Sequence, residues 1–210
     1  MSLTVLLADD HSVVREGLRL LLERDGIRVV GEATDGQAAV DLARRLEPNV
    51  AVLDLAMPIL NGLEAARQIS RLVPRVGTIL LALHTTDNNV LDALRAGVRG
   101  YVLKAQPIDE LRGAIAAVAR GEIYLSPGVS DAVVNAYLSG AAAPIQRLSP
   151  RERQVLQLVA EGCSTKQVGV LLGVTAKTAE THRGRVMKKL GIHTTVGLVR
   201  YAIREGLISP

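Results

Sequence analysis

Hydrophobic positions in the first half of the chain alternate between short continuous runs and a three- to four-residue spacing. The continuous runs, "LTVLLA", "RVVGEA", "VAVLDL", "TILLAL" and "GYVL", are typical of buried strands. Between them, apolar residues recur at helical spacing, as at Val14, Leu18 and Leu22. Strands that alternate with helices form a parallel sheet covered on both faces. Residues 1–122 therefore predict a five-stranded, doubly wound, flavodoxin-like α/β domain.

The pattern changes after this domain. A last helix is expected from about Pro107 to Arg120, and "GEIYLSPGVS" is interpreted as a turn-rich exit. Residues 123–146 are interpreted as a linker with one short helix at "DAVVNAYL". From residue 147 to 210 the pattern is helical throughout, with very short turns. In "SPRERQVLQLVAEG", a Ser cap and Pro at the first helical position precede the helix and Gly closes it. This part predicts an all-α domain of four helices.

Charge is divided unevenly between the two halves. Residues 1–125 carry 14 Lys and Arg against 16 Asp and Glu, whereas residues 126–210 carry 11 against 5. The formal net charge of +4 therefore combines a mildly acidic first part with a basic tail. A basic tail on its own predicts a nucleic-acid partner for that part of the chain.

The composition indicates the cellular compartment in which the protein is expected. The single cysteine, Cys163, excludes an internal disulfide and favours a reducing compartment. The sequence has no apolar run long enough to span a bilayer, and its start lacks the basic segment of a secretory signal. We therefore expect a cytoplasmic protein that does not enter a membrane.

Aspartates follow two of the predicted strands where each ends. Asp9 and Asp10 come after the first run, and Asp54 ends the third. Since ligands of an open parallel sheet bind beyond the carboxyl ends of its strands, these carboxylates would meet and repel one another without a cation. Oxygen ligands favour Mg²⁺ over zinc, and the four scattered histidines predict no metal cluster. Lys104 closes the fifth strand at the same edge, where it would neutralise a transferring phosphoryl group together with the metal.

Three motifs lie on these strands in order: "ADD", "DLAMPILNG" and "GYVLK". Together they resemble the signatures of two-component receiver domains, and with its helical tail the whole chain resembles a NarL/FixJ-type response regulator. The resemblance implies that a sensor histidine kinase phosphorylates Asp54 and that Lys104 pairs with the phosphoryl oxygens. It also implies that Asp10 binds Mg²⁺ directly, Asp9 largely through water, and Ala56 through its backbone carbonyl.

The fourth strand departs from the receiver pattern. Receivers end it with a Ser or Thr whose hydroxyl bonds the phosphoryl group, and Ala82 stands there instead. Thr85 and Thr86 follow closely and are interpreted as loop residues, although a shifted loop would let one of them substitute. Tyr101 matches the switch aromatic of the family. Gly62, in the second motif, is interpreted as permitting a tight turn.

The stretch from Leu148 to Ile208 resembles the LuxR-type helix-turn-helix domain. The "GVT" turn joins a scaffold helix to a recognition helix expected from about Ala176 to Leu190, which would enter the major groove. Basic and hydroxyl side chains suit phosphates, while a carboxylate and a threonine on the groove face suit base edges. The residues expected at DNA are Lys166, Lys177, Thr178, Glu180, Thr181, Arg183, Gly184, Arg185, Lys188 and Lys189.

The last helix, in "TTVGLVRYAIREG", is amphipathic. Part of its apolar stripe must pack on its own domain, and by family resemblance the rest forms a homodimer contact on paired DNA half-sites. The residues expected at that contact are Val196, Val199, Arg200 and Ile203.

These features favour a transcriptional regulator and not an enzyme in the ordinary sense. Phosphorylation of Asp54 would shift the protein from a closed, DNA-masked form to a dimer that binds a promoter. One alternative is an atypical receiver in which Ala82 removes the phosphoswitch and DNA is bound independently of phosphorylation. A more remote alternative is an aspartyl-phosphate phosphatase or phosphotransferase, but Ala56 stands where such an enzyme commonly needs an acid or base.

Overall fold

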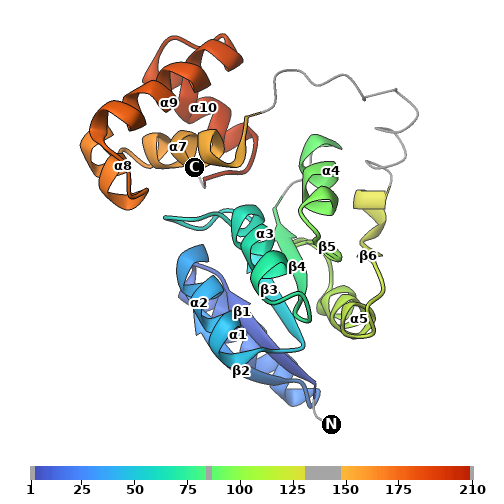
Figure 1. Cartoon of the computed structure of the whole chain (residues 1–210). Helices are drawn as coiled ribbons and strands as arrows, with labels where there is room; N and C mark the ends of the chain where they lie inside the picture. Colours follow the sequence, from blue (N-terminus) through green and yellow to red (C-terminus); the bar gives the residue numbers. More distant parts are fainter. Residues whose placement is uncertain (1–2, 84–86, 131–147, 209–210) are drawn as a thin grey trace.

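The structure is a computed structural model that describes residues 3–83, 87–130 and 148–208. Figure 1 shows two parts, a sheet flanked by helices and a separate group of helices toward the C-terminus. The described residues contain no helix that is both long and apolar enough to cross a membrane.

Six parallel strands form one sheet in the order β2-β1-β3-β4-β5-β6, confirming the predicted α/β domain. The strands are β1 (Thr4–Ala8), β2 (Arg28–Ala33), β3 (Val50–Asp54), β4 (Gly77–Ala82), β5 (Gly100–Leu103) and β6 (Tyr124–Leu125). The prediction of five strands missed β6, which lies in the stretch interpreted as a turn-rich exit and pairs with β5. Two residues are too few to show a hydrophobic period.

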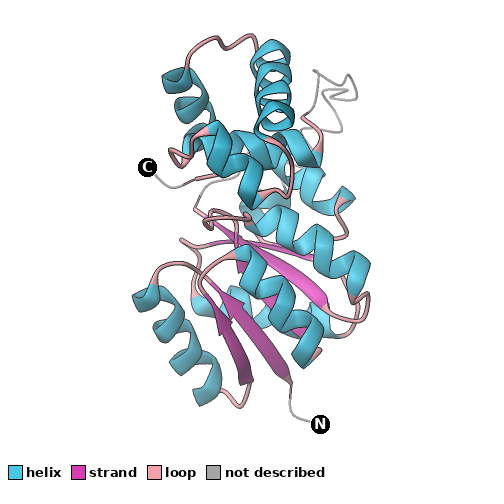
Figure 2. Cartoon of the chain, turned by 60° about the vertical axis from the view of Figure 1, so that its left-hand side comes forward, coloured by secondary structure: helices cyan, strands magenta, loops and turns pink. Residues whose placement is uncertain are grey.

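Helices cover both faces of this sheet (Figure 2). Alternate residues of each strand point to opposite faces: Leu6 of β1 enters one hydrophobic cluster and Leu7 the other. α2, α3 and α4 contribute to the first cluster, and α1 and α5 to the second. The helix bounds are α1 (Ser12–Arg24), α2 (Gly36–Leu46), α3 (Gly62–Leu72), α4 (Asp87–Arg95) and α5 (Ile108–Ala119).

The C-terminal part packs around its own core, which includes the fully buried Leu156 and Leu198. Its helices are α7 (Pro150–Ala160), α8 (Thr165–Leu171), α9 (Ala176–Leu190) and α10 (Thr195–Arg204). The bounds of α9 agree with those expected for the recognition helix. Each helix begins at a Ser or Thr cap, and α7 has a complete capping box in which Ser149 and Glu152 bond each other's backbone N–H.

Two sequence-based expectations lie outside the described residues. These are the short helix at "DAVVNAYL" and the positions of Thr85 and Thr86. The domain boundaries at residues 122 and 146 stay predictions.

Candidate functional site

Three aspartates predicted from strand ends lie together at the carboxyl edge of the sheet. Asp54 is the last residue of β3, and Asp9 and Asp10 directly follow β1, its neighbour in the sheet. One ligand atom from each, with one from His11, lies within 4.8 Å of the others. Asp9 and Asp54 are nearly inaccessible to solvent, at 2% and 4% exposure. Burial of two like charges requires compensation by a cation.

Lys104 provides part of that compensation. Its Nζ donates to Asp9 Oδ2 at 2.8 Å and lies 3.0 Å from Asp54 Oδ2, so β5 brings the ammonium between both carboxylates, as predicted. Burial raises the pKa of Asp54 to about 6, because desolvation of the carboxylate outweighs the lowering by Lys104. Burial alone would lower the pKa of Lys104, but the two carboxylates raise it. One lysine therefore does not fully neutralise this site.

The donor set fits a hard divalent cation. Carboxylate oxygens from Asp9, Asp10 and Asp54 are the ligand type that Mg²⁺ prefers. His11 was not expected here, because the four histidines are scattered along the sequence. Its Nδ1 lies 2.8 Å from Asp10 Oδ1, and its position next to Asp10 in the sequence was the signal that could have placed it.

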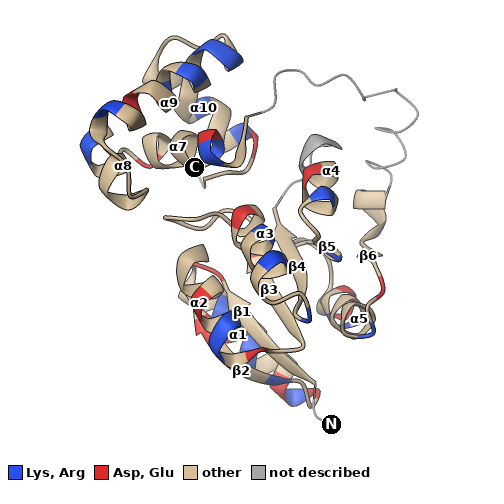
Figure 3. Ribbon diagram, viewed as in Figure 1, with Lys and Arg blue, Asp and Glu red and all other residues tan. Residues whose placement is uncertain are grey.

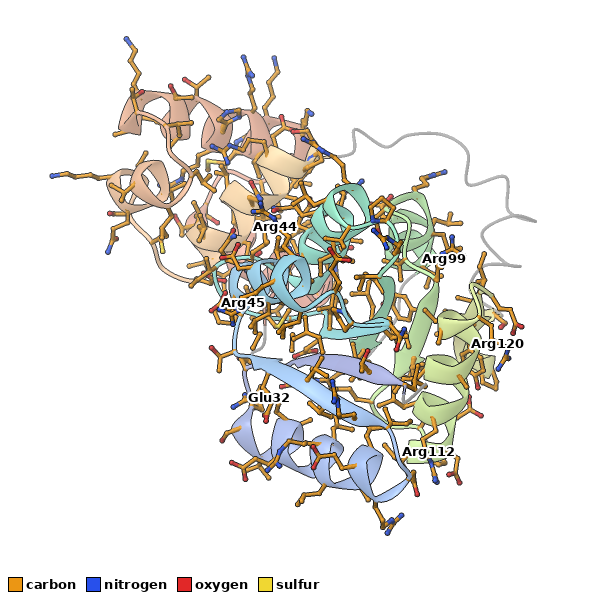
Figure 4. The ribbon with its side chains drawn as sticks, turned by 60° about the horizontal axis from the view of Figure 1, so that its bottom comes forward. Glu32, Arg44, Arg45, Arg99, Arg112 and Arg120 are labelled. Atoms are coloured by element: carbon orange, nitrogen blue, oxygen red, sulfur yellow. The ribbon has the colours of Figure 1, made fainter. Side chains whose placement is uncertain are left out.

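Arg15 is a second residue that sequence reasoning missed. From α1 its Nη1 donates to the backbone carbonyl of Asp9 at 2.7 Å, while its Nε donates to Glu32 on β2 at 3.0 Å. Glu32 is labelled at its place on the sheet in Figure 4. Arg15 thereby ties the loop that carries Asp9 and Asp10 to the neighbouring strand, which fixes one wall of the site.

Gly62 has a different role from the tight turn that was predicted. It is the first residue of α3, and a Cβ placed on it would lie 2.1 Å from the backbone oxygen of Asp54. Its φ is not among the positive values found at other glycines. Gly62 is therefore required by close approach of two backbones, which sets α3 directly against the end of β3.

The two described switch positions, Ala82 and Tyr101, are both buried. Ala82 ends β4 with 1% exposure, and its carbonyl accepts from Lys104 N at 2.8 Å. Its methyl group has no hydrogen to donate to an oxygen in the site. Tyr101 is buried in β5 at 1% exposure. The main chain of Ala82 is thus held next to Lys104, but the Ala82 side chain adds no polar contact.

Basic residues lie on all four helices of the C-terminal part, and α9 carries the largest share of them (Figure 3). Most residues expected at DNA are exposed, namely Lys166, Lys177, Thr178, Glu180, Thr181, Gly184, Arg185 and Lys188. Arg183 is half-buried and donates to Thr195 Oγ1 at 2.9 Å. Lys189 is half-buried as well and its Nζ lies 2.6 Å from Glu152 Oε2, so this lysine helps to fix α9 on α7.

α10 has the expected division of its apolar stripe. Leu198 and Ala202 are fully buried in the domain core, while Val196 is 64% exposed. Arg200 is exposed, and Val199 and Ile203 are half-buried. Val196 and Arg200 are thus accessible on one side of the helix.

Models of two protein families match the chain. A response regulator receiver domain matches residues 5–116, and the luxR family of bacterial regulatory proteins matches residues 146–202. The chain belongs to the two-component response regulators. It combines a receiver domain with a LuxR-type DNA-binding domain, as the sequence motifs predicted.

Similar proteins align with nearly the whole length of this chain. The transcriptional regulatory protein MctR of Rhizobium johnstonii is 39% identical over 98% of this chain and 95% of its own length. The response regulator UvrY of Escherichia coli is 35% identical over 98% of this chain and 95% of its own length. A structure of RcsB from Salmonella enterica, bound to a promoter with a phosphomimetic, is 30% identical with a TM-score of 0.71, covering 96% of this chain and 98% of that one.

Proposed function

We propose that the protein is a transcription factor whose Asp54 accepts a phosphoryl group from the phosphohistidine of a sensor kinase. The observation that carries this proposal is the Lys104 ammonium, held within 3.0 Å of both buried carboxylates, Asp9 and Asp54. A buried anion with a fixed cation beside it is the arrangement that stabilises charge on a transferring phosphoryl group.

In the proposed transfer, a carboxylate oxygen of Asp54 attacks phosphorus. The new P–O bond forms as the P–N bond to the kinase histidine breaks, and the bond electrons leave with the imidazole nitrogen. Lys104 would pair with the phosphoryl oxygens, and Asp9, Asp10, Asp54 and the carbonyl of Ala56 would hold Mg²⁺. When bound, Mg²⁺ supplies the additional positive charge that shields the approaching phosphoryl oxygens from the carboxylates. Water later hydrolyses the acyl phosphate, so the receiver acts only on its own modification.

The helix-turn-helix part would read double-stranded promoter DNA in the cytoplasm. The exposed face of α9 would enter the major groove, with lysines and arginines on phosphates and Glu180 and Thr181 at base edges. α10 would pair with α10 of a second copy through Val196, Val199, Arg200 and Ile203. The exposed Val196 supports this arrangement, because a two-fold dimer would cover it.

A second candidate function has a specific observation in its favour. Ala82 leaves the end of β4 without a hydroxyl, so the protein would bind DNA regardless of phosphorylation. The loss of one hydrogen bond to a charged group would weaken coupling by about 1.5–3 kcal/mol, comparable to a whole allosteric coupling free energy.

Sedimentation of the full chain with Mg²⁺, before and after addition of beryllium fluoride, separates these two functions. Beryllium fluoride on a carboxylate stands in for an aspartyl phosphate. We expect a shift from monomer to dimer that Asp54→Ala abolishes. If the protein binds the mimic without any change in sedimentation, dimerisation is not controlled by Asp54 and the second function is favoured. An increased shift in Ala82→Thr would measure the coupling lost at that position.

Two lysines on α9 provide a matched test of the DNA face. Lys177 is exposed, whereas Lys189 is paired with Glu152. We expect Lys177→Ala to reduce affinity for duplex DNA and to lower the slope of log K against log salt by about 1. Lys189→Ala should instead lower the melting temperature of the domain with a smaller change in that slope. Fluorescence anisotropy over a salt series measures the slope, and equal slopes in both variants would contradict this placement of the DNA face.

A further inference from the structure

Asp9 is held through both its backbone and its side chain. Its backbone N donates to the carbonyl of Ala33 on β2 at 3.2 Å, and its own carbonyl accepts from Arg15 Nη1 at 2.7 Å. In the side chain, Oδ1 accepts from the backbone N of His11 at 2.9 Å and Oδ2 accepts from Lys104 Nζ at 2.8 Å. The position of Asp9 is therefore fixed by other groups of the protein.

The neighbouring Asp10 depends on Asp9 for its direction. Its side chain is 31% exposed, and among the described residues its carboxylate has one close partner, His11 Nδ1, at 2.8 Å. The peptide unit between Asp9 and Asp10 is planar, so its carbonyl oxygen and the Cα of Asp10 move together. A bond that holds the Asp9 carbonyl therefore also determines where the Asp10 carboxylate starts from.

Arg15 makes that bond from near the start of α1. Its side chain is only 14% exposed, and while Nη1 donates to the Asp9 carbonyl, Nε donates to Glu32 Oε2 at 3.0 Å. The guanidinium is planar and presents its donors in a fixed fork, so the bond to Glu32 sets the direction of Nη1. Glu32 lies on β2, which is paired with β1 along the sheet. The carbonyl of Asp9 is thereby referred to the rigid sheet.

We propose that Arg15 and Glu32 are positioning residues for the cation, because together they orient the peptide unit that directs Asp10 into the site. This inference rests on the proposed Mg²⁺ site. Neither residue is assigned a contact with the cation or with the phosphoryl group. Arg15 acts on Asp10 through the Asp9 carbonyl, and Glu32 acts through Arg15.

The charge of Arg15 has the opposite effect on a cation. A guanidinium repels Mg²⁺, so its removal would strengthen Mg²⁺ binding if charge alone mattered. Loss of a bond that orients a ligand instead weakens metal binding, by about 10- to 100-fold for outer-shell partners. The two effects differ in sign at Arg15, and the measured affinity for Mg²⁺ therefore decides between them.

Calorimetric titration of Mg²⁺ into the full chain tests the proposal. We expect Arg15→Ala to weaken Mg²⁺ binding about tenfold, although it removes a positive charge. Arg19→Ala is the matched control, since Arg19 lies one turn further along α1 and its Nε is 3.3 Å from Glu32 Oε1. In the part of the chain that the structure describes, Arg19 makes no bond to Asp9. Its charge is partly exposed and screened, so Mg²⁺ affinity should stay within about twofold of the wild type.

A double-variant cycle tests the part assigned to Glu32. Glu32→Ala should weaken Mg²⁺ binding in the wild type but change it less than about twofold in Arg15→Ala, because Glu32 acts through Arg15. Arg15→Lys keeps the charge but has no fork that reaches both partners, so it should bind Mg²⁺ less tightly than the wild type. Thermal melting in EDTA, followed by circular dichroism, establishes that each variant folds. If Arg15→Ala does not fold, Arg15→Lys carries the test.

Several results would overturn the proposal. Unchanged or tighter Mg²⁺ binding in Arg15→Ala would leave Arg15 a structural role only, even if the melting temperature fell. An equal loss in Arg19→Ala would show that the bond to Asp9 is not what matters. A Glu32→Ala effect that persists at full size without Arg15 would be an effect of charge. Wild-type affinity in Arg15→Lys would show that the fork is not needed. Absence of Mg²⁺ binding in the wild type would instead overturn the proposed function itself.

Discussion

Gly62→Ala is expected to destabilise the receiver by about 3 kcal/mol and to abolish the response to beryllium fluoride. The added Cβ would lie 2.1 Å from the Asp54 oxygen and 3.2 Å from Leu55 Cα, and both are backbone atoms that cannot rotate away. Either α3 or the end of β3 must therefore move, and overpacking of this kind costs about 1–3 kcal/mol or more. Movement of β3 also displaces the Asp54 carboxylate from Lys104. Urea unfolding followed by circular dichroism measures the stability.

Gly17→Ala is the matched control for this change. Gly17 lies within α1, and a Cβ there would meet nothing within 4 Å. Alanine is a better helix former than glycine, so this variant should be more stable than the wild type by about 0.5–1 kcal/mol. Equal stability of Gly62→Ala and the wild type would show that α3 and β3 do not approach as closely as described.

The fold could be predicted because its periodicity is strong and long. Parallel strands buried on both faces appear as continuous apolar runs, and helices that cover them have a separate, 3.6-residue period. β6 could not be found in this way, since a two-residue strand has no period. It forms because the chain leaving α5 runs beside β5, where Tyr124 N donates to the carbonyl of Arg99.

The residues of the candidate site that lie at the ends of strands could be predicted from the sequence. Asp54 ends β3, while Asp9 and Lys104 directly follow β1 and β5, and parallel topology brings the carboxyl ends of these three strands to one edge. His11 and Arg15 lie on the segment after β1, where the direction of a side chain depends on local backbone geometry. Lys189 shows the converse. The helical pattern marks Lys189 only as one more basic residue of α9. Its partner Glu152 lies 37 positions earlier, so the pattern of α9 does not show the pairing.

The contact between the domains could not be predicted from the pattern. Gln157 lies on a helix whose apolar positions already account for packing in its own domain. A glutamine outside that apolar stripe is expected to be exposed to solvent. It is buried because a loop about 100 residues earlier supplies Met57 and Asn61 as partners. The pairing of Gln157 with this loop depends on the surfaces of both domains, and the hydrophobic pattern of the sequence shows neither surface.

Asp54→Asn is expected to stabilise the protein in EDTA at pH 8 by about 2–3 kcal/mol while removing phosphoryl acceptance. The pKa of Asp54 is about 6 in the folded protein against an ordinary 3.8. Between these values the folded state binds more protons than the unfolded state, so stability falls as pH rises from about 4 to 6 and stays lower above it. A shift of about 2 pKa units corresponds to about 3 kcal/mol. The amide carries no charge and avoids that loss.

The pH dependence distinguishes this cause from a general change in packing. The gain in Asp54→Asn, measured by urea unfolding, should shrink below pH 6 and approach zero near pH 4, whereas a packing effect would persist there. Asp41→Asn, at an exposed position of α2, should change stability by less than about 0.5 kcal/mol at either pH. Mg²⁺ should stabilise the wild type more than Asp54→Asn, because a bound cation offsets the charge that Lys104 leaves uncompensated. The same buried charge that lowers stability would therefore make the receiver responsive to the cation and to phosphorylation.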